Sequence, residues 1–106
     1  MKTYIHKFKK WNFNSSCKVH IKKEGDITFI AFEDIGDGTS VTNASEDIAT
    51  EIVAKEGLDP EKCRFFEFYP EFGGEVDEIS YTWKSGKAIS PKWKRFCEAD
   101  KNPFIE

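Results

Sequence analysis

The sequence predicts a single α+β domain over residues 1–106, with one long helix packed on a mainly antiparallel sheet of about five strands and a short C-terminal helix. A length of 106 residues is typical of one hydrophobic core. Short alternating runs separated by turn residues predict strands, and one amphipathic run is long enough for a helix. Sixteen aromatic residues can fill the core, because each buries about 150–250 Å².

The N-terminal part predicts three strands. Residues 3–13 mix apolar and aromatic side chains with lysines, which favours a long strand with one bulge, followed by a turn at residues 14–16. Residues 17–23 alternate cleanly, and residues 27–34 are apolar on both faces, as is typical of a central strand. Gly25 lies between these two strands, where a hairpin turn needs a positive φ.

A long helix is expected over residues 44–56. Asn43 is its expected N-cap, Glu46 would complete a capping box, and Gly57 would close the helix. Its apolar stripe predicts packing on one face of the sheet.

The C-terminal part predicts two strands and a second helix. The strands are expected over residues 63–69 and from near Glu78 to residue 83. Ser90 followed by Pro91 is typical of a helix start, which predicts a short helix over residues 91–99. The expected order is therefore β-β-β-α-β-β-α.

Charge is distributed unevenly around a net value of -3. Residues 1–25 carry +6 and the segment from 79 to the C-terminus carries +3, whereas residues 26–78 are strongly acidic. We expect the basic ends to pair with the acidic middle in the fold; two separate charged faces are the alternative.

The cysteines predict a cytoplasmic protein. Cys17, Cys63 and Cys97 lie far apart, without the spacing of a zinc site. An odd number of cysteines and no recognisable signal peptide predict reduced thiols. No segment approaches the roughly 18 apolar residues of a membrane span, so membrane contact is not expected. No cofactor is expected either, because no cofactor-binding motif is complete.

The connection before the long helix reads DIGDGTSVTNASEDIA from Asp34, and it resembles a phosphate-binding loop in composition. A dinucleotide fingerprint would need a third Gly, and a P-loop would need a Lys, so neither motif is complete. A capped turn is the favoured interpretation. A ligand loop is the alternative, since a helix N-terminus offers free amides beside Thr39, Ser40, Thr42 and Asn43.

Five carboxylates surround the last two predicted strands: Glu67, Glu71, Glu75, Asp77 and Glu78. They predict an acidic surface for a protein partner. The alternative is a small metal-dependent hydrolase or nuclease, in which Glu67 and Glu78 would act with Lys84 and a histidine. His6 and His20 are otherwise expected as half-exposed strand residues, and no catalytic residue or metal ligand is assigned.

Two segments combine bases with aromatic residues, namely Lys7, Lys9, Lys10 and Trp11, and Lys92, Trp93 and Arg95. This combination is found on stacking platforms for single-stranded nucleic acid. The net negative charge argues against that interpretation.

Two short motifs resemble a pattern in small uncharacterised bacterial proteins. In that pattern S-V-T-N precedes a short helix and a hydrophobic strand ends in E-x-Y-P; here these are residues 40–43 and 67–70. The resemblance covers about a third of the chain and implies a cytosolic protein of bacterial or mobile-element origin, with no activity attached.

Because no catalytic or cofactor motif is complete, the sequence favours a non-enzymatic cytosolic module that binds a protein partner or a second copy of itself. A metal-dependent hydrolase and a nucleic-acid-binding module are the alternatives.

Overall fold

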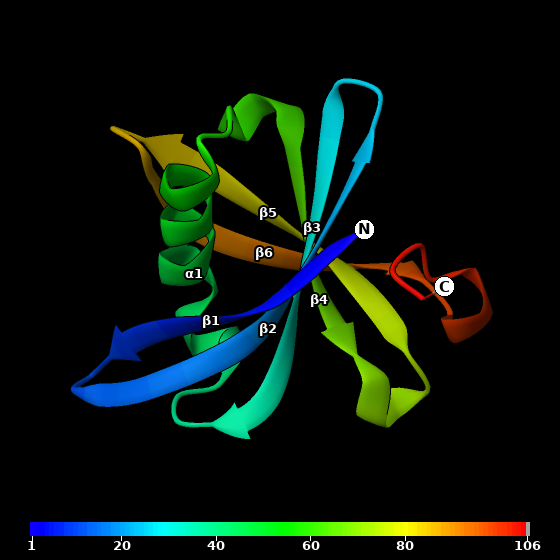
Figure 1. Ribbon diagram of the computed structural model, residues 1–106, viewed down its shortest axis with the longest axis horizontal. Coiled ribbons are helices and arrows are strands. Elements are labelled where there is room, and N and C mark those ends of the chain that lie inside the picture. Colours follow the sequence, from blue (N-terminus) through cyan, green and yellow to red (C-terminus); the bar gives the residue numbers. More distant parts are fainter. Residues whose placement is uncertain (106) are drawn as a thin grey trace.

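Six strands form one mixed sheet in the computed structural model, which describes residues 1–105 (Figure 1). The strands are β1 (Lys2–Lys10), β2 (Phe13–Glu24), β3 (Ile27–Asp37), β4 (Cys63–Tyr69), β5 (Glu75–Lys84) and β6 (Lys87–Cys97), and the helix is α1 (Val41–Glu56). Short 3-10 turns span Pro60–Lys62, Pro70–Phe72 and Ala99–Lys101. The α+β class and the long helix on the sheet are confirmed, and the sheet has six strands where about five were expected.

The strands lie in the sheet in the order of the sequence, from β1 to β6. Neighbouring strands are antiparallel except β3 and β4, which are parallel. Parallel neighbours need a crossover connection, and α1 supplies it. Two antiparallel meanders are therefore joined at the centre of the sheet by one helix.

The first turn lies earlier in the chain than the sequence predicts. β1 and β2 are joined by Trp11 and Asn12, with φ of 51° and 66°, and residues 14–16 lie within β2. A two-residue hairpin turn requires these left-handed conformations, which Asn tolerates and Trp rarely adopts. The Trp-Asn pair therefore carried no recognisable turn signal. The predicted hairpin around Gly25, with φ of 62°, is present.

The predicted C-terminal helix is wrong, because the same residues form strand β6. Trp93 pairs with Ile79 of β5, so pairing with the sheet overrides the local Ser-Pro helix signal. Ser90 has a φ of 54° where the register between β5 and β6 shifts, which is the geometry of a bulge. Pro91 is tolerated there because β6 is an edge strand.

Helix α1 begins earlier than predicted and has a different N-cap. Ser40, not Asn43, is the N-cap, and its hydroxyl accepts a hydrogen bond from the Asn43 amide at 3.4 Å. Val41 thereby joins the helix and is buried. The first turn contains no acidic residue, but the Asp34 carboxylate accepts a hydrogen bond from the Val41 amide at 3.1 Å. A carboxylate from β3 thus supplies the negative charge that a helix N-terminus favours.

The main core lies between α1 and one face of the sheet. Its fully buried members include Val19, Ile30, Phe32, Ile48 and Ile52. Both edge strands also reach the helix. From β1, Lys2 pairs with Glu56 at 2.9 Å and Lys10 with Asp47 at 2.8 Å, and from β6 the Ala88 amide donates to the Thr50 hydroxyl at 2.9 Å. The two ion pairs join the basic N-terminal end to the acidic middle of the chain, as the charge distribution predicts.

A smaller cluster covers part of the opposite face of the sheet, and its buried members are Ala31, Phe66, Phe68, Val76 and Phe104. Residues after β6 close it. The Asn102 side chain donates to the Gly74 carbonyl and accepts from the Phe104 amide, both at 2.8 Å. Within residues 1–105, no helix has the length and apolar character needed to cross a membrane.

The cap assignment can be tested by comparing two variants. Ser40→Ala should lower the free energy of unfolding by about 1 kcal/mol, because it removes the N-cap acceptor. Asn43→Ala should leave it nearly unchanged, because the Asn43 side chain is exposed and only its backbone amide takes part in the cap. Urea unfolding of both variants measures this; a larger loss in Asn43→Ala would restore Asn43 as the cap.

Candidate functional site

Hydrogen bonds within the protein fix the connection between β3 and α1. Asp34 accepts hydrogen bonds from the amides of Gly36 at 2.7 Å and Val41 at 3.1 Å. The Thr39 amide donates to the Ser15 hydroxyl at 2.8 Å. A Cβ atom at Gly38 would overlap Ser15 and lie 2.7 Å from the Asn14 carbonyl oxygen. Gly38 and Asp34 therefore have structural roles in this connection.

The four predicted ligand-loop residues divide between two places. Thr39, Ser40 and Asn43 line a hollow of about 400 Å³ whose other residues are Trp11, Phe13 and Gly38. We call this the tip hollow. Thr42 is not part of it, because the Thr42 hydroxyl donates to Glu67 at 2.9 Å.

Trp11 and Phe13 at the tip hollow are the most exposed aromatic pair of the β1–β2 hairpin, each with 63% of its surface accessible. The sequence indicated Trp11 only as a nucleic-acid contact and did not indicate Phe13. Their proximity to the start of α1 depends on the close approach of Gly38 to β2, which no local pattern reveals.

The five predicted acidic residues do not form one free acidic surface. Glu78 accepts two hydrogen bonds from Arg64, at 2.8 and 2.7 Å, and Arg95 lies 3.1 Å from Glu75 and 3.4 Å from Asp77.

Glu67 and Glu78 also lie on opposite faces of the sheet. Glu67 pairs with Asp77, and Glu78 is the next residue along β5, so its side chain points the other way. The structure therefore does not bring together the pair of carboxylates on which the hydrolase alternative depended.

Glu67 is a buried carboxyl group, with only 3% of its surface accessible. It accepts hydrogen bonds from the Thr42 hydroxyl at 2.9 Å and from the Trp93 indole at 3.0 Å. No salt bridge to Glu67 exists within residues 1–105. Burial raises its pKa, and hydrogen bonds from Thr42, Trp93 and Tyr69 only partly oppose this.

Glu67 lines a second hollow, of about 330 Å³, at the end of β4. Its residues are Asp34, Gly36, Glu67, Phe68, Tyr69, Pro70, Glu71 and Phe72, and we call it the acidic hollow. The rings of Tyr69 and Phe72 meet edge to face at 6.4 Å, and Phe72 is 69% exposed. Burial and the charges of Glu67 and Asp77 raise the pKa of Tyr69, which therefore stays protonated at neutral pH.

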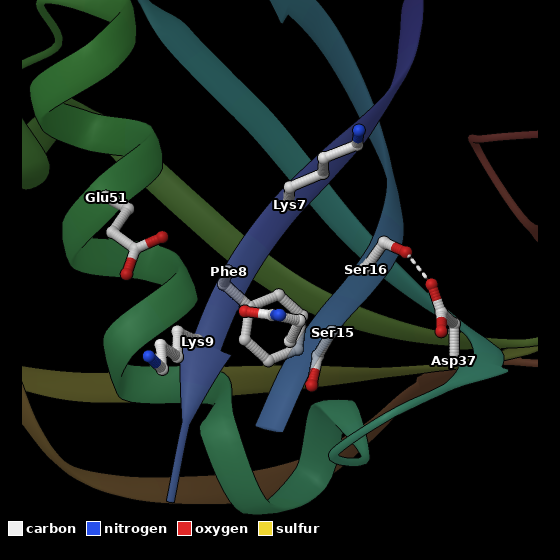
Figure 2. Close-up of a pocket in the computed structure, with 8 residues that line it drawn as sticks. Lys7, Phe8, Lys9, Ser15, Ser16, Asp37 and Glu51 are labelled. Carbon is white, nitrogen blue, oxygen red and sulfur yellow. Dashed lines mark hydrogen bonds between the residues drawn. The ribbon is translucent and has the colours of Figure 1, made fainter. Parts of the chain in front are cut away.

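A third hollow, of about 690 Å³, lies across β1 and β2 and is shown in Figure 2. Ser16 donates a hydrogen bond to Asp37 there, drawn as a dashed line. The charged ends of Lys7, Lys9 and Asp37 point in different directions, so they do not converge on one point where a reacting group would sit (Figure 2).

The two histidines are buried, and the expectation that they are half-exposed is wrong. His6 lies 2.7 Å from Glu51 of α1, and His20 lies 3.0 Å from Glu33 on the other face of the sheet. In the described part of the chain, no group of three or more His, Cys, Asp or Glu side chains could hold a metal ion.

The cysteines are free thiols. Burial raises the pKa of Cys17 to about 12 and that of Cys63 to about 11, so neither is a thiolate at neutral pH.

The two basic and aromatic segments lie on opposite edge strands. Lys7, Lys9 and Lys10 belong to β1, with Trp11 in the turn that follows it, whereas Lys92, Trp93 and Arg95 belong to β6. The Trp93 indole is directed to Glu67, and Arg95 contacts acidic side chains of β5. The segments therefore do not form one continuous stacking platform.

No protein-family model matches the chain, and comparisons with curated proteins and with solved structures found no similar chain.

The role of Gly38 can be tested against a matched glycine. Gly36 and Gly38 both have positive φ, 74° and 79°, but a Cβ atom would meet neighbouring atoms only at Gly38. Gly36→Ala should lose about 1–2 kcal/mol of stability from the left-handed conformation alone. Gly38→Ala should lose about 1–3 kcal/mol more from overlap with β2, measured by urea unfolding. Equal losses would contradict the close contact.

The buried state of Glu67 predicts a pH-dependent stability. Its pKa is raised in the folded state, so the folded protein holds this proton at pH values where the unfolded chain has lost it. Stability should fall as pH rises from the unfolded pKa, about 4.3, through the folded one. Glu67→Gln should lack this fall and be more stable than the wild type at pH 7.

Urea unfolding at pH values from about 4 to 8 measures this difference, with Glu71→Gln as the control for the loss of one charge at the same hollow. A wild-type protein that gains stability relative to Glu67→Gln as pH rises would contradict the burial effect.

Proposed function

We propose that the protein is a non-enzymatic interaction module that binds a protein partner through the end of the domain at which α1 begins. The observation that carries this proposal is the exposed pair Trp11 and Phe13, which lines the tip hollow beside the helix N-terminus.

Neither aromatic residue is explained by the hairpin turn. Such turns favour Asn-Gly or similar pairs, whereas Trp11 adopts a φ of 51° that bulky residues rarely take. Backbone conformations of this kind cluster at functional sites. Trp is also among the residues that dominate binding energies at protein interfaces. An exposed, strained Trp therefore supports a role in binding.

Other exposed apolar residues lie at the same end of the molecule. Ile35 near the end of β3 and Phe72 after β4 are both exposed. In the lower part of Figure 1, the β1–β2 tip lies at the left and the end of β4 at the right, with the end of β3 and the start of α1 between them. Asp34 and Gly36 line the acidic hollow, and Gly38, Thr39 and Ser40 line the tip hollow, so one connection borders both. A partner could thus contact one continuous surface.

A different protein is favoured over a second copy of the chain. Pairing of edge strands is the simplest route to self-association, and both edges carry features that oppose it. β1 carries four lysines, and β6 carries Pro91 and the bulge at Ser90.

The same proposal includes a cytoplasmic location and a bacterial origin. Free cysteines support a reducing compartment, and the S-V-T-N and E-x-Y-P motifs support the origin.

The proposal predicts a selective loss of binding in a double variant. Trp11→Ala with Phe13→Ala should weaken partner binding by about 30-fold or more, as removal of an interface hot spot does. Because both side chains are exposed, the free energy of unfolding should change little. Ile5→Ala and Ile89→Ala serve as matched controls, since both residues are exposed and apolar but lie elsewhere.

The measurement is affinity capture from the source cell with each immobilised variant, followed by calorimetric titration of the purified partner. Full binding by the double variant would contradict the proposal. If the wild-type protein forms a dimer at higher concentration and the double variant does not, the partner is a second copy of the chain.

A further inference from the structure

The acidic hollow contains a buried carboxyl group without a counter-charge. Glu67 is 97% buried, yet its hydrogen-bond partners Thr42 and Trp93 are neutral, and no basic residue lines the hollow. Buried charges in proteins are usually paired, because removal of an ion from water is unfavourable. No cation of the described part of the chain lines the hollow to pair with the ionised form of Glu67.

Both arginines of the chain pair with carboxylates outside the hollow. Arg95 contacts Glu75 and Asp77, and Arg64 forms a two-point contact with Glu78 on the opposite face. Neither arginine lines the hollow. A cation at Glu67 would therefore come from outside the part of the chain that the structure describes.

The walls of the hollow suit an organic cation. Asp34 and Glu71 add two more carboxylates, and Tyr69 and Phe72 present aromatic rings in contact with each other. Aromatic faces attract cations, and carboxylates bind guanidinium groups through charged hydrogen bonds. A guanidinium is planar and weakly hydrated, so it enters a partly buried aromatic site more readily than an ammonium.

We propose that the acidic hollow binds a guanidinium cation, with Glu67 as its main anionic partner and Phe72 as an aromatic wall. The volume of about 330 Å³ lies at the small end of known ligand sites, which run from roughly 300 to 1,000 Å³, and it fits a side chain rather than a nucleotide. The guanidinium belongs either to an arginine of a protein segment or to a small free compound.

The expected cost of ionising Glu67 agrees with the geometry of the hollow. Burial raises the pKa of this carboxyl group, so the fold is destabilised by its ionised form. Residues that lower stability are commonly retained for function. A bound cation would offset the desolvation of Glu67, which the hydrogen bonds from Thr42, Trp93 and Tyr69 offset only in part.

This inference rests on Glu67 and its hollow, and not on Trp11 and Phe13. The acidic hollow would still bind a guanidinium cation if the protein partner bound elsewhere on the molecule.

The test is a titration of the protein with blocked peptides, monitored by NMR at the Trp93 indole N–H. This group donates to Glu67 at 3.0 Å, so its signal should move when the hollow fills. The probes are acetyl-Gly-Arg-Gly-amide, the same peptide with citrulline in place of arginine, and N-methylguanidinium chloride. The arginine peptide should bind with a Kd of about 10 mM or lower, and the uncharged citrulline peptide at least about 10-fold more weakly.

Three variants locate the site. Glu67→Gln should weaken arginine-peptide binding at least about 10-fold and Phe72→Ala about 3-fold or more, whereas Glu61→Gln, an equal change of charge at an exposed position elsewhere, should bind as the wild type does. The urea unfolding curve of each variant confirms that it is folded.

The probes also distinguish the source of the cation. Tighter binding of the arginine peptide than of N-methylguanidinium would indicate a protein segment, and equal binding would indicate a small compound. Equal binding of the citrulline peptide, or undiminished binding by Glu67→Gln, would overturn the inference. Normal cation binding by the Trp11→Ala, Phe13→Ala double variant separates this result from the test of the proposed function.

Discussion

The burial of α1 against the sheet is the interaction on which the other features of this protein depend. Ala44, Ile48 and Ile52 are inaccessible to solvent, and strands from both edges of the sheet contact the helix. The same helix makes the parallel pairing of β3 and β4 possible, because it carries the chain across the sheet between them. Its position also fixes where its first turn meets the ends of β3 and β4, and both hollows lie there.

The end at which α1 begins combines structural and binding roles in the same residues. Asp34 caps the first turn of α1 and lines the acidic hollow, and Ser40 is the N-cap and lines the tip hollow. Thr42, inside the first turn, holds the carboxyl group of Glu67. The connection between β3 and α1, which resembles a phosphate-binding loop in composition, thus supports the two neighbouring hollows.

The sequence was informative where a local pattern decides the structure and misleading where pairing between distant residues decides it. The clean alternation of residues 17–23 placed a strand correctly, and the apolar stripe of the long helix placed α1 on the sheet. Residues 91–97 carry a true helix-start signal, but their pairing with β5 outweighs it. Glu67 was indicated as one acid among five; only the fold shows that it alone is buried beneath Thr42 and Trp93.

The order of strands in the sheet has a consequence for how the chain folds. Every antiparallel pairing joins strands that follow each other directly, through turns that close small loops. Such local pairings form quickly, since little chain entropy is lost when a short loop closes. The parallel contact of β3 with β4 is the one pairing among the described strands that must wait for an intervening helix to dock. We therefore expect its closure to be the slow step that joins two three-stranded halves into one cooperative unit.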